Sequence, residues 1–148
     1  MDPSGDSDPQ GRSGRSGGAR PAPNVTLRPA ERADLLDVLR IERESFADPW
    51  PYSAFESLLD APAFLIAVGD PDGALDGQSI LGYVVGDVTP NHGRDIGHIK
   101  DLAVRPEARG AGIGRRLLRE ALVELSLSGA VVAKLEVRAG NDAARSLY

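Results

Sequence analysis

The sequence contains no cysteine. This absence excludes disulfide bonds, thiolate nucleophiles, and zinc or iron–sulfur sites that depend on cysteine ligands. Long apolar segments are also missing, because no run approaches the roughly 20 residues that a transmembrane helix needs, and the N-terminal residues are polar. We therefore expect a cytoplasmic protein without a membrane partner.

Lysine is scarce as well. Only Lys100 and Lys134 are lysines among the 17 basic residues, and the acidic residues exceed the basic ones, which gives a formal net charge of -5. A negative net charge argues against general binding to nucleic-acid phosphates, so no direct nucleic-acid partner is predicted. A chain of 148 residues with 41% hydrophobic residues has room for a single core.

The first 24 residues differ in composition from the remainder of the chain. Residues 1–24 consist almost wholly of Gly, Ser, Pro, Asp and Arg, with almost nothing apolar to bury. We predict a disordered tail over residues 1–24 and one folded domain over residues 25–148.

Apolar periodicity in the first part of this domain predicts a short strand and two helices. Residues 25–28 alternate like a strand, and residues 31–45 carry apolar residues at helical spacing. Residues 47–52 contain two prolines, which predicts a loop. Ser53 and Glu56 have the spacing of a capping box, so a second short helix is expected to begin there. The side chains expected to face the core are Leu35, Leu36, Leu39, Phe46, Phe55, Leu58 and Leu59.

The second part of the domain predicts a sheet. Residues 63–68 and 80–85 are apolar runs separated by turn residues, which is typical of a hairpin, and residues 97–104 form a third strand. A helix follows, and residues 131–137 form a last strand. The helix is expected to bury Leu117, Leu118, Ala121, Leu122 and Leu125. The fold class is therefore α/β, with a mixed, mainly antiparallel sheet flanked by helices.

A glycine-rich turn over residues 104–116, VRPEARGAGIGRR, joins the third strand to the following helix. Unpaired amides and a partial positive charge at a helix N-terminus favour a phosphate group, and glycine lets it approach closely. A Walker loop would end in Gly-Lys-Ser/Thr, whereas Gly114 is followed by two arginines. A dinucleotide fingerprint that starts at Gly110 would need glycine in place of Arg115. A tight turn without a ligand is the alternative interpretation.

This turn resembles the pyrophosphate loop of the GNAT superfamily of acetyl-CoA-dependent N-acyltransferases, whose pattern is Arg/Gln-x-x-Gly-x-Gly/Ala. Here the pattern is Arg109-x-x-Gly112-x-Gly114 after the strand. The resemblance implies that acetyl-CoA is bound by the turn, by the preceding strand and by an asparagine of the last helix. That asparagine could also be a simple helix N-cap, and Arg115 could be a solvated arginine. The implied cofactor-binding residues are Leu102, Ala103, Val104, Arg109, Gly110, Ala111, Gly112, Ile113, Gly114, Arg115 and Asn141.

The end of the chain, LEVRAGNDAARSLY, resembles the RimI-like branch of this superfamily, which contains the ribosomal-protein alanine N-acetyltransferases and their archaeal relatives. In that branch the glutamate of LEVR is the general base and the tyrosine of LY is the general acid. These roles fall on Glu136 and Tyr148. A general base is useful because an N-terminal amine, with a pKa of about 7.7–8.0, is mostly protonated near neutral pH.

Other residues are candidates for the acceptor side. The resemblance places His98 near the LEVR glutamate, where it could relay a proton or bind a metal with the glutamate, or could be an ordinary hydrogen-bonded strand histidine. No metal is assigned. Asp48 falls where archaeal relatives carry an acidic residue near the substrate amine. Trp50 and Tyr52 could line the pocket for the first side chain, although both could instead be core or rim residues.

Members of the family continue past the LY tyrosine, whereas this sequence stops at Tyr148. We therefore expect a C-terminally incomplete domain that lacks the family's last strands. The resemblance predicts transfer of an acetyl group from acetyl-CoA to the N-terminal α-amine of a protein, either a ribosomal protein or a broader set of N-terminal substrates, by direct attack in a ternary complex. The alternatives are acetylation of a small-molecule amine and a non-catalytic acyl-CoA-binding module.

Overall fold

The computed structural model describes residues 24–69 and 79–136. Residues 1–23 of the tail predicted over residues 1–24, residues 70–78, and the residues from Val137 to Tyr148 lie outside the described residues. The elements in chain order are β1 (Val25–Pro29), η3 (Arg32–Asp34), α1 (Leu35–Ser45), α2 (Tyr52–Glu56), β2 (Leu65–Gly69), β3 (Ser79–Thr89), β4 (Ile96–Val104), η4 (Pro106–Ala108), α3 (Ile113–Leu127) and β5 (Val132–Leu135).

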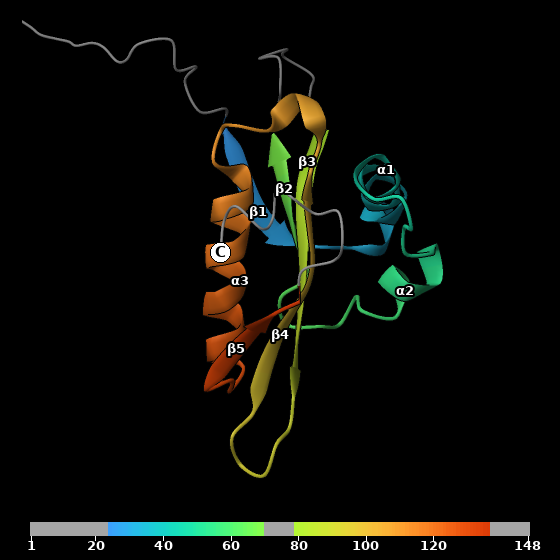
Figure 1. Ribbon diagram of the computed structural model, residues 1–148. Helices are drawn as coiled ribbons and strands as arrows, with labels where there is room; N and C mark the ends of the chain where they lie inside the picture. Colours follow the sequence, from blue (N-terminus) through green and yellow to red (C-terminus); the bar gives the residue numbers. More distant parts are fainter. Residues whose placement is uncertain (1–23, 70–78, 137–148) are drawn as a thin grey trace, which may run out of the picture.

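The strands form one sheet in the order β1-β2-β3-β4-β5. The neighbours β1 to β4 pair antiparallel, and β5 pairs parallel with β4. One face of the sheet is covered by α3 and the other by α1 and α2 (Figure 1). The predicted fold class, a mixed and mainly antiparallel sheet flanked by helices, is confirmed.

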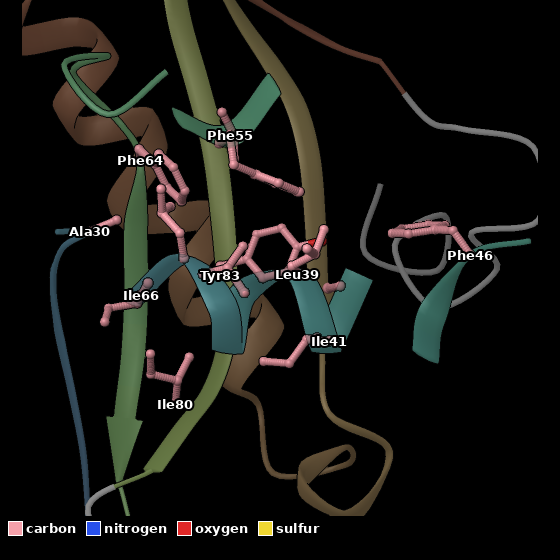
Figure 2. Packing of buried hydrophobic residues seen from close by; sticks show 13 residues of the cluster. Ala30, Leu39, Ile41, Phe46, Phe55, Phe64, Ile66, Ile80 and Tyr83 are labelled. Carbon is pink, nitrogen blue, oxygen red and sulfur yellow. The ribbon is translucent and has the colours of Figure 1, made fainter. Parts of the chain in front are cut away.

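The first layer of the core lies between α1, α2 and the sheet. Helix α1 buries Leu35, Val38, Leu39, Ile41 and Glu42, the spacing of one helical face. The prediction that Leu36 faces the core is wrong, because its side chain is 69% exposed. One residue turns a helix by about 100°, which carries Leu36 off the buried face. Figure 2 shows this layer, with Phe55, Phe64 and Tyr83 close together.

The start of α2 also differs from the prediction. The helix begins at Tyr52 with Pro51 at its N-cap, and no side chain caps it. Ser53 therefore lies inside the helix, because Pro51 already supplies a residue with extended backbone immediately before it. A capping contact occurs instead before α1, where the Glu31 amide donates to Asp34 Oδ2 at 2.7 Å.

The second layer lies between α3 and the opposite face of the sheet. Helix α3 buries Ile113, Leu117, Ala121 and Leu125, as its periodicity predicts. Leu118 and Leu122 are partly buried and pack against this cluster. Because the glycine-rich turn connects β4 to α3, this packing holds the turn at the end of that strand.

Strand β4 contains a bulge. Val85 pairs with Asp101 and Gly86 pairs with Ile99, so Lys100 has no partner of its own on β3. An extra residue changes which positions face each side of the sheet. Ile99 and Leu102 both pack on the α3 side, whereas Asp101 lies within hydrogen-bond distance of Tyr83, a member of the α1-side cluster.

Candidate active site

The glycine-rich turn runs from the end of β4 through η4 to α3. Gly110 and Gly112 adopt φ angles of +86° and +82°, in the left-handed region that side chains other than glycine rarely occupy. A methyl group placed on either glycine would meet no other atom within 4 Å, chain neighbours aside. Both glycines are thus required by the backbone conformation, and the space beside them is open.

The backbone amides of this turn are available to a ligand. The first backbone bond of α3 runs from the Arg116 amide to the Gly112 carbonyl, at 3.1 Å. In the part of the chain that the structure describes, the amides from Gly110 to Arg115 donate to no carbonyl, and no side chain caps Gly112. Such a group of free amides at a helix N-terminus fits the pyrophosphate of a CoA thioester.

The arginines of the turn do not all face this open side. Arg109 donates from Nε to the Val104 carbonyl at 2.9 Å and lies 3.4 Å from the Ser45 hydroxyl, so its side chain braces the turn. Arg116 donates to the Val25 carbonyl at 3.2 Å. Arg115 is exposed, and its side chain forms no hydrogen bond or ion pair within the described residues. A contact between Arg115 and a phosphate stays a prediction.

On the side away from β3, the last residues of β4 face no other described strand. The Arg105 amide donates to the Leu81 carbonyl of β3, so by alternation the amides of Leu102 and Val104 point away from β3. On that side β5 ends at Leu135, opposite Ile99, and no described strand faces Leu102 to Val104. The Leu102 amide donates to Asp101 Oδ1 at 3.0 Å. The Val104 amide therefore fits the predicted contact with the pantetheine arm better than the Leu102 amide does.

His98 and Glu136 are paired. Nδ1 of His98 lies 3.0 Å from Oε2 of Glu136, and their side chains are 19% and 53% exposed. Because Ile99 faces α3, its neighbour His98 faces the side of α1 and α2. With an ionised carboxylate as acceptor, Nδ1 is the donor, which leaves Nε2 of a neutral imidazole able to accept a proton. The predicted proximity of these residues is found, and their chemical role remains a prediction.

The predicted acceptor loop follows α1 on the same face of the sheet. Asp48 is exposed. Trp50 and Tyr52 are partly buried and pack against the α1-side cluster, with the Trp50 ring centroid 5.3 Å from that of Phe55. Both aromatics thus lie at the rim of the core, and their contact with a substrate stays a prediction. Tyr148 and Asn141 lie outside the described residues.

Sequence reasoning missed a buried polar cluster beneath this loop, formed by Glu42, Tyr83 and Asp101. The relative exposure of these residues is 0%, 0% and 3%. The Tyr83 hydroxyl donates to Glu42 Oε1 and lies 3.2 Å from Asp101 Oδ2. The one available signal was Glu42, an acidic residue at a core-facing position of the α1 pattern.

Among the described residues, no group of three or more His, Asp or Glu side chains is arranged to hold a metal ion. Their helices are also too short or too polar to cross a bilayer.

A glycine turn with free amides beside an open strand edge is the arrangement expected of an acyl-CoA-dependent transferase. The family described as "Acetyltransferase (GNAT) family" matches residues 35–148. The chain is 36% identical over 130 residues to the N-alpha-acetyltransferase RimI of Mycobacterium tuberculosis, covering 84% of this chain and 75% of that protein.

Solved structures share the fold. The ribosomal-protein-S18-alanine N-acetyltransferase from Escherichia coli is similar with a TM-score of 0.63 and 28% identity, covering 84% of this chain and 74% of that one. The NatC complex bound to Gag peptide and CoA contains a chain with a TM-score of 0.72 and 22% identity, covering 84% of this chain and 80% of that one. The protein belongs to the acetyltransferase (GNAT) family, and it is an acetyl-CoA-dependent N-acetyltransferase.

Proposed function

We propose that this protein acetylates the α-amine of a protein N-terminus by direct attack within a ternary complex. The observation that carries the proposal is the His98–Glu136 pair, 3.0 Å apart, on the face of the sheet that also carries the acceptor loop. The names of the relatives support a protein substrate, because the E. coli structure is that of an S18-alanine N-acetyltransferase.

Each group of residues has its own role in binding or proton transfer. The amides of the glycine turn hold the pyrophosphate, and acetyl-CoA supplies the activated acetyl thioester. The free Val104 amide hydrogen-bonds the pantetheine arm or polarises the thioester carbonyl. The incoming N-terminus arrives mainly as an ammonium group, which must lose a proton before it can attack. Glu136, together with His98, takes that proton, and Tyr148 is the proposed acid for the leaving thiolate.

The substitution Glu136→Gln tests this assignment. We expect it to leave the Kd for CoA within about twofold and to lower kcat/KM about 100-fold, the effect of losing a general base. The loss should be largest at low pH, because a larger share of the substrate amine is then protonated. The measurement is CoA release from acetyl-CoA with short peptides, between pH 6 and 9, with calorimetric binding of CoA.

The matched control is Glu120→Gln, which removes the same charge from an exposed position on α3, the opposite face of the sheet. We expect wild-type rates from it at every pH. A Glu136→Gln variant that loses CoA binding would make Glu136 a structural residue. Turnover with polyamines and none with peptides would reject the protein substrate.

A further inference from the structure

A continuous chain of polar contacts crosses the core from the acceptor loop to the last residues of β4. The Trp50 amide donates to Glu42 Oε2 at 2.7 Å, and the Tyr83 hydroxyl donates to Glu42 Oε1. Tyr83 also lies 3.2 Å from Asp101 Oδ2, and the other oxygen of Asp101 accepts from the Leu102 amide. The chain thus links the Trp50 amide of the acceptor loop to the Leu102 amide of β4.

Burying a carboxylate completely is costly unless its oxygens are hydrogen-bonded. Glu42 is fully buried in the last turns of α1, and each of its two oxygens accepts a hydrogen bond from a different element. Burial first, and then the neighbouring carboxylates, raise the pKa of Tyr83 well above its ordinary value, so its hydroxyl keeps its hydrogen. The hydroxyl therefore remains a donor throughout the neutral range.

We propose that Glu42 is a positioning residue for the acceptor substrate. By holding the Trp50 amide, Glu42 fixes the backbone of residues 47–51 above the core, and so sets the shape of the surface that receives the first residues of the peptide. This inference rests on the proposed function, since it names a residue that controls binding of the N-terminal substrate. Glu42 touches no reacting atom and acts only through the loop.

Two substitutions separate the effect of the length of the Glu42 side chain from the effect of its charge. Glu42→Gln keeps the length of the side chain: its carbonyl can accept from Trp50, and its amide can donate to the Tyr83 oxygen, whose hydrogen then turns to Asp101. Glu42→Asp keeps the charge but is one methylene shorter, so it cannot hold both donors. A positioning role predicts that Gln is tolerated and Asp is not.

The expected result is a KM for an alanine-starting hexapeptide about tenfold higher in Glu42→Asp and within about twofold of wild type in Glu42→Gln, as expected for one lost hydrogen bond. The kcat and the Kd for CoA should change by less than about twofold in both. The hexapeptide, chosen without tryptophan, can also be titrated directly, because Trp50 is the single tryptophan of the chain and reports on the loop by fluorescence.

Tyr83→Phe is the matched control, since it removes the donor at the other oxygen of Glu42 and leaves the Trp50 contact in place. We expect a lower melting temperature, an unchanged Trp50 emission spectrum and an unchanged peptide KM. If Glu42→Gln is impaired and Glu42→Asp is not, the carboxylate acts through its charge and the proposal is wrong.

Two further patterns overturn the proposed role of Glu42. One is an unchanged peptide KM in both Glu42 variants, and the other is an equal increase in peptide KM in Glu42→Asp, Glu42→Gln and Tyr83→Phe. A wild-type protein that turns over no peptide refutes the proposed function, and the role of Glu42 with it. Wild-type turnover combined with either of the two patterns refutes only the role of Glu42.

Discussion

Gly112→Ala is the sharpest test of the cofactor turn. Gly112 has a φ angle of +82°, and an added methyl group would meet no protein atom within 4 Å, so the cost of the substitution comes from the backbone and not from a clash. Left-handed backbone costs a residue with a side chain about 1–2 kcal/mol. The strain can lower the stability of the folded protein. Alternatively, the turn can relax in the free protein, and the free energy needed to restore its conformation then weakens CoA binding.

The loss in stability and the loss in free energy of CoA binding should add up to the free energy of the strain. If the turn relaxes fully, a cost of about 1–2 kcal/mol corresponds to roughly 5- to 30-fold weaker binding of CoA. Calorimetric titration with CoA measures the loss in binding, and urea unfolding without CoA measures the loss in stability. The added methyl group also occupies the open side on which the phosphates are expected, which works in the same direction.

Gly93→Ala is a closely matched control. Gly93 has a φ angle of +81° and equally open surroundings, but it lies in the turn between β3 and β4. The same strain of about 1–2 kcal/mol should appear there entirely as lost stability, with the Kd for CoA unchanged. Equal weakening of CoA binding by both substitutions would refute the assignment of the turn, and so would a Gly112→Ala variant in which neither CoA binding nor stability changes.

Two further predictions concern stability. Burial raises the pKa of Asp34, but hydrogen bonds from Arg28 and the Glu31 amide outweigh it and hold that pKa below its ordinary value. The stabilisation by this carboxylate is therefore complete above about pH 4 and is lost as the pH falls through the lower folded pKa, so urea unfolding of Asp34→Asn should depend less on pH between about pH 5 and 2 than that of wild type. Leu117→Ala, at a fully buried position, should lower the free energy of unfolding by about 2–5 kcal/mol, whereas Leu127→Ala, at a position 76% exposed, should change it by less than about 0.5 kcal/mol; equal effects in chemical denaturation would contradict the described packing of α3.

The order of the elements and the glycine turn could be predicted because their signals are local. Alternation, helical periodicity and the spacing of glycines and prolines act over a few residues, which is why the antiparallel pairing of β2 with β3 and the buried face of α3 agree with expectation. The errors were local as well. Leu36 was assigned by its apolar character without regard to helix phase, and the capping box at Ser53 ignored the effect of Pro51.

The polar core could not be predicted in this way. Glu42 and Tyr83 are 41 positions apart in the chain and meet only when α1 packs on the sheet. In isolation Glu42 looks like a surface residue, and Tyr83 looks like an ordinary aromatic residue of a strand. The nearness of His98 and Glu136, 38 positions apart, was expected only from the family resemblance, since neither residue carries a local signal for the other.

The bulge at Lys100 gives β4 an unusual tolerance to changes in length. Before the bulge the even-numbered residue His98 faces α1 and α2, and after it the odd-numbered Asp101 does. Deleting Lys100 alone would restore regular pairing with β3 and leave every other side chain of the strand on its present face. Deleting Leu102 instead would turn Ala103 and Val104 over. A one-residue gap in an alignment of relatives is therefore least disruptive in this strand at Lys100.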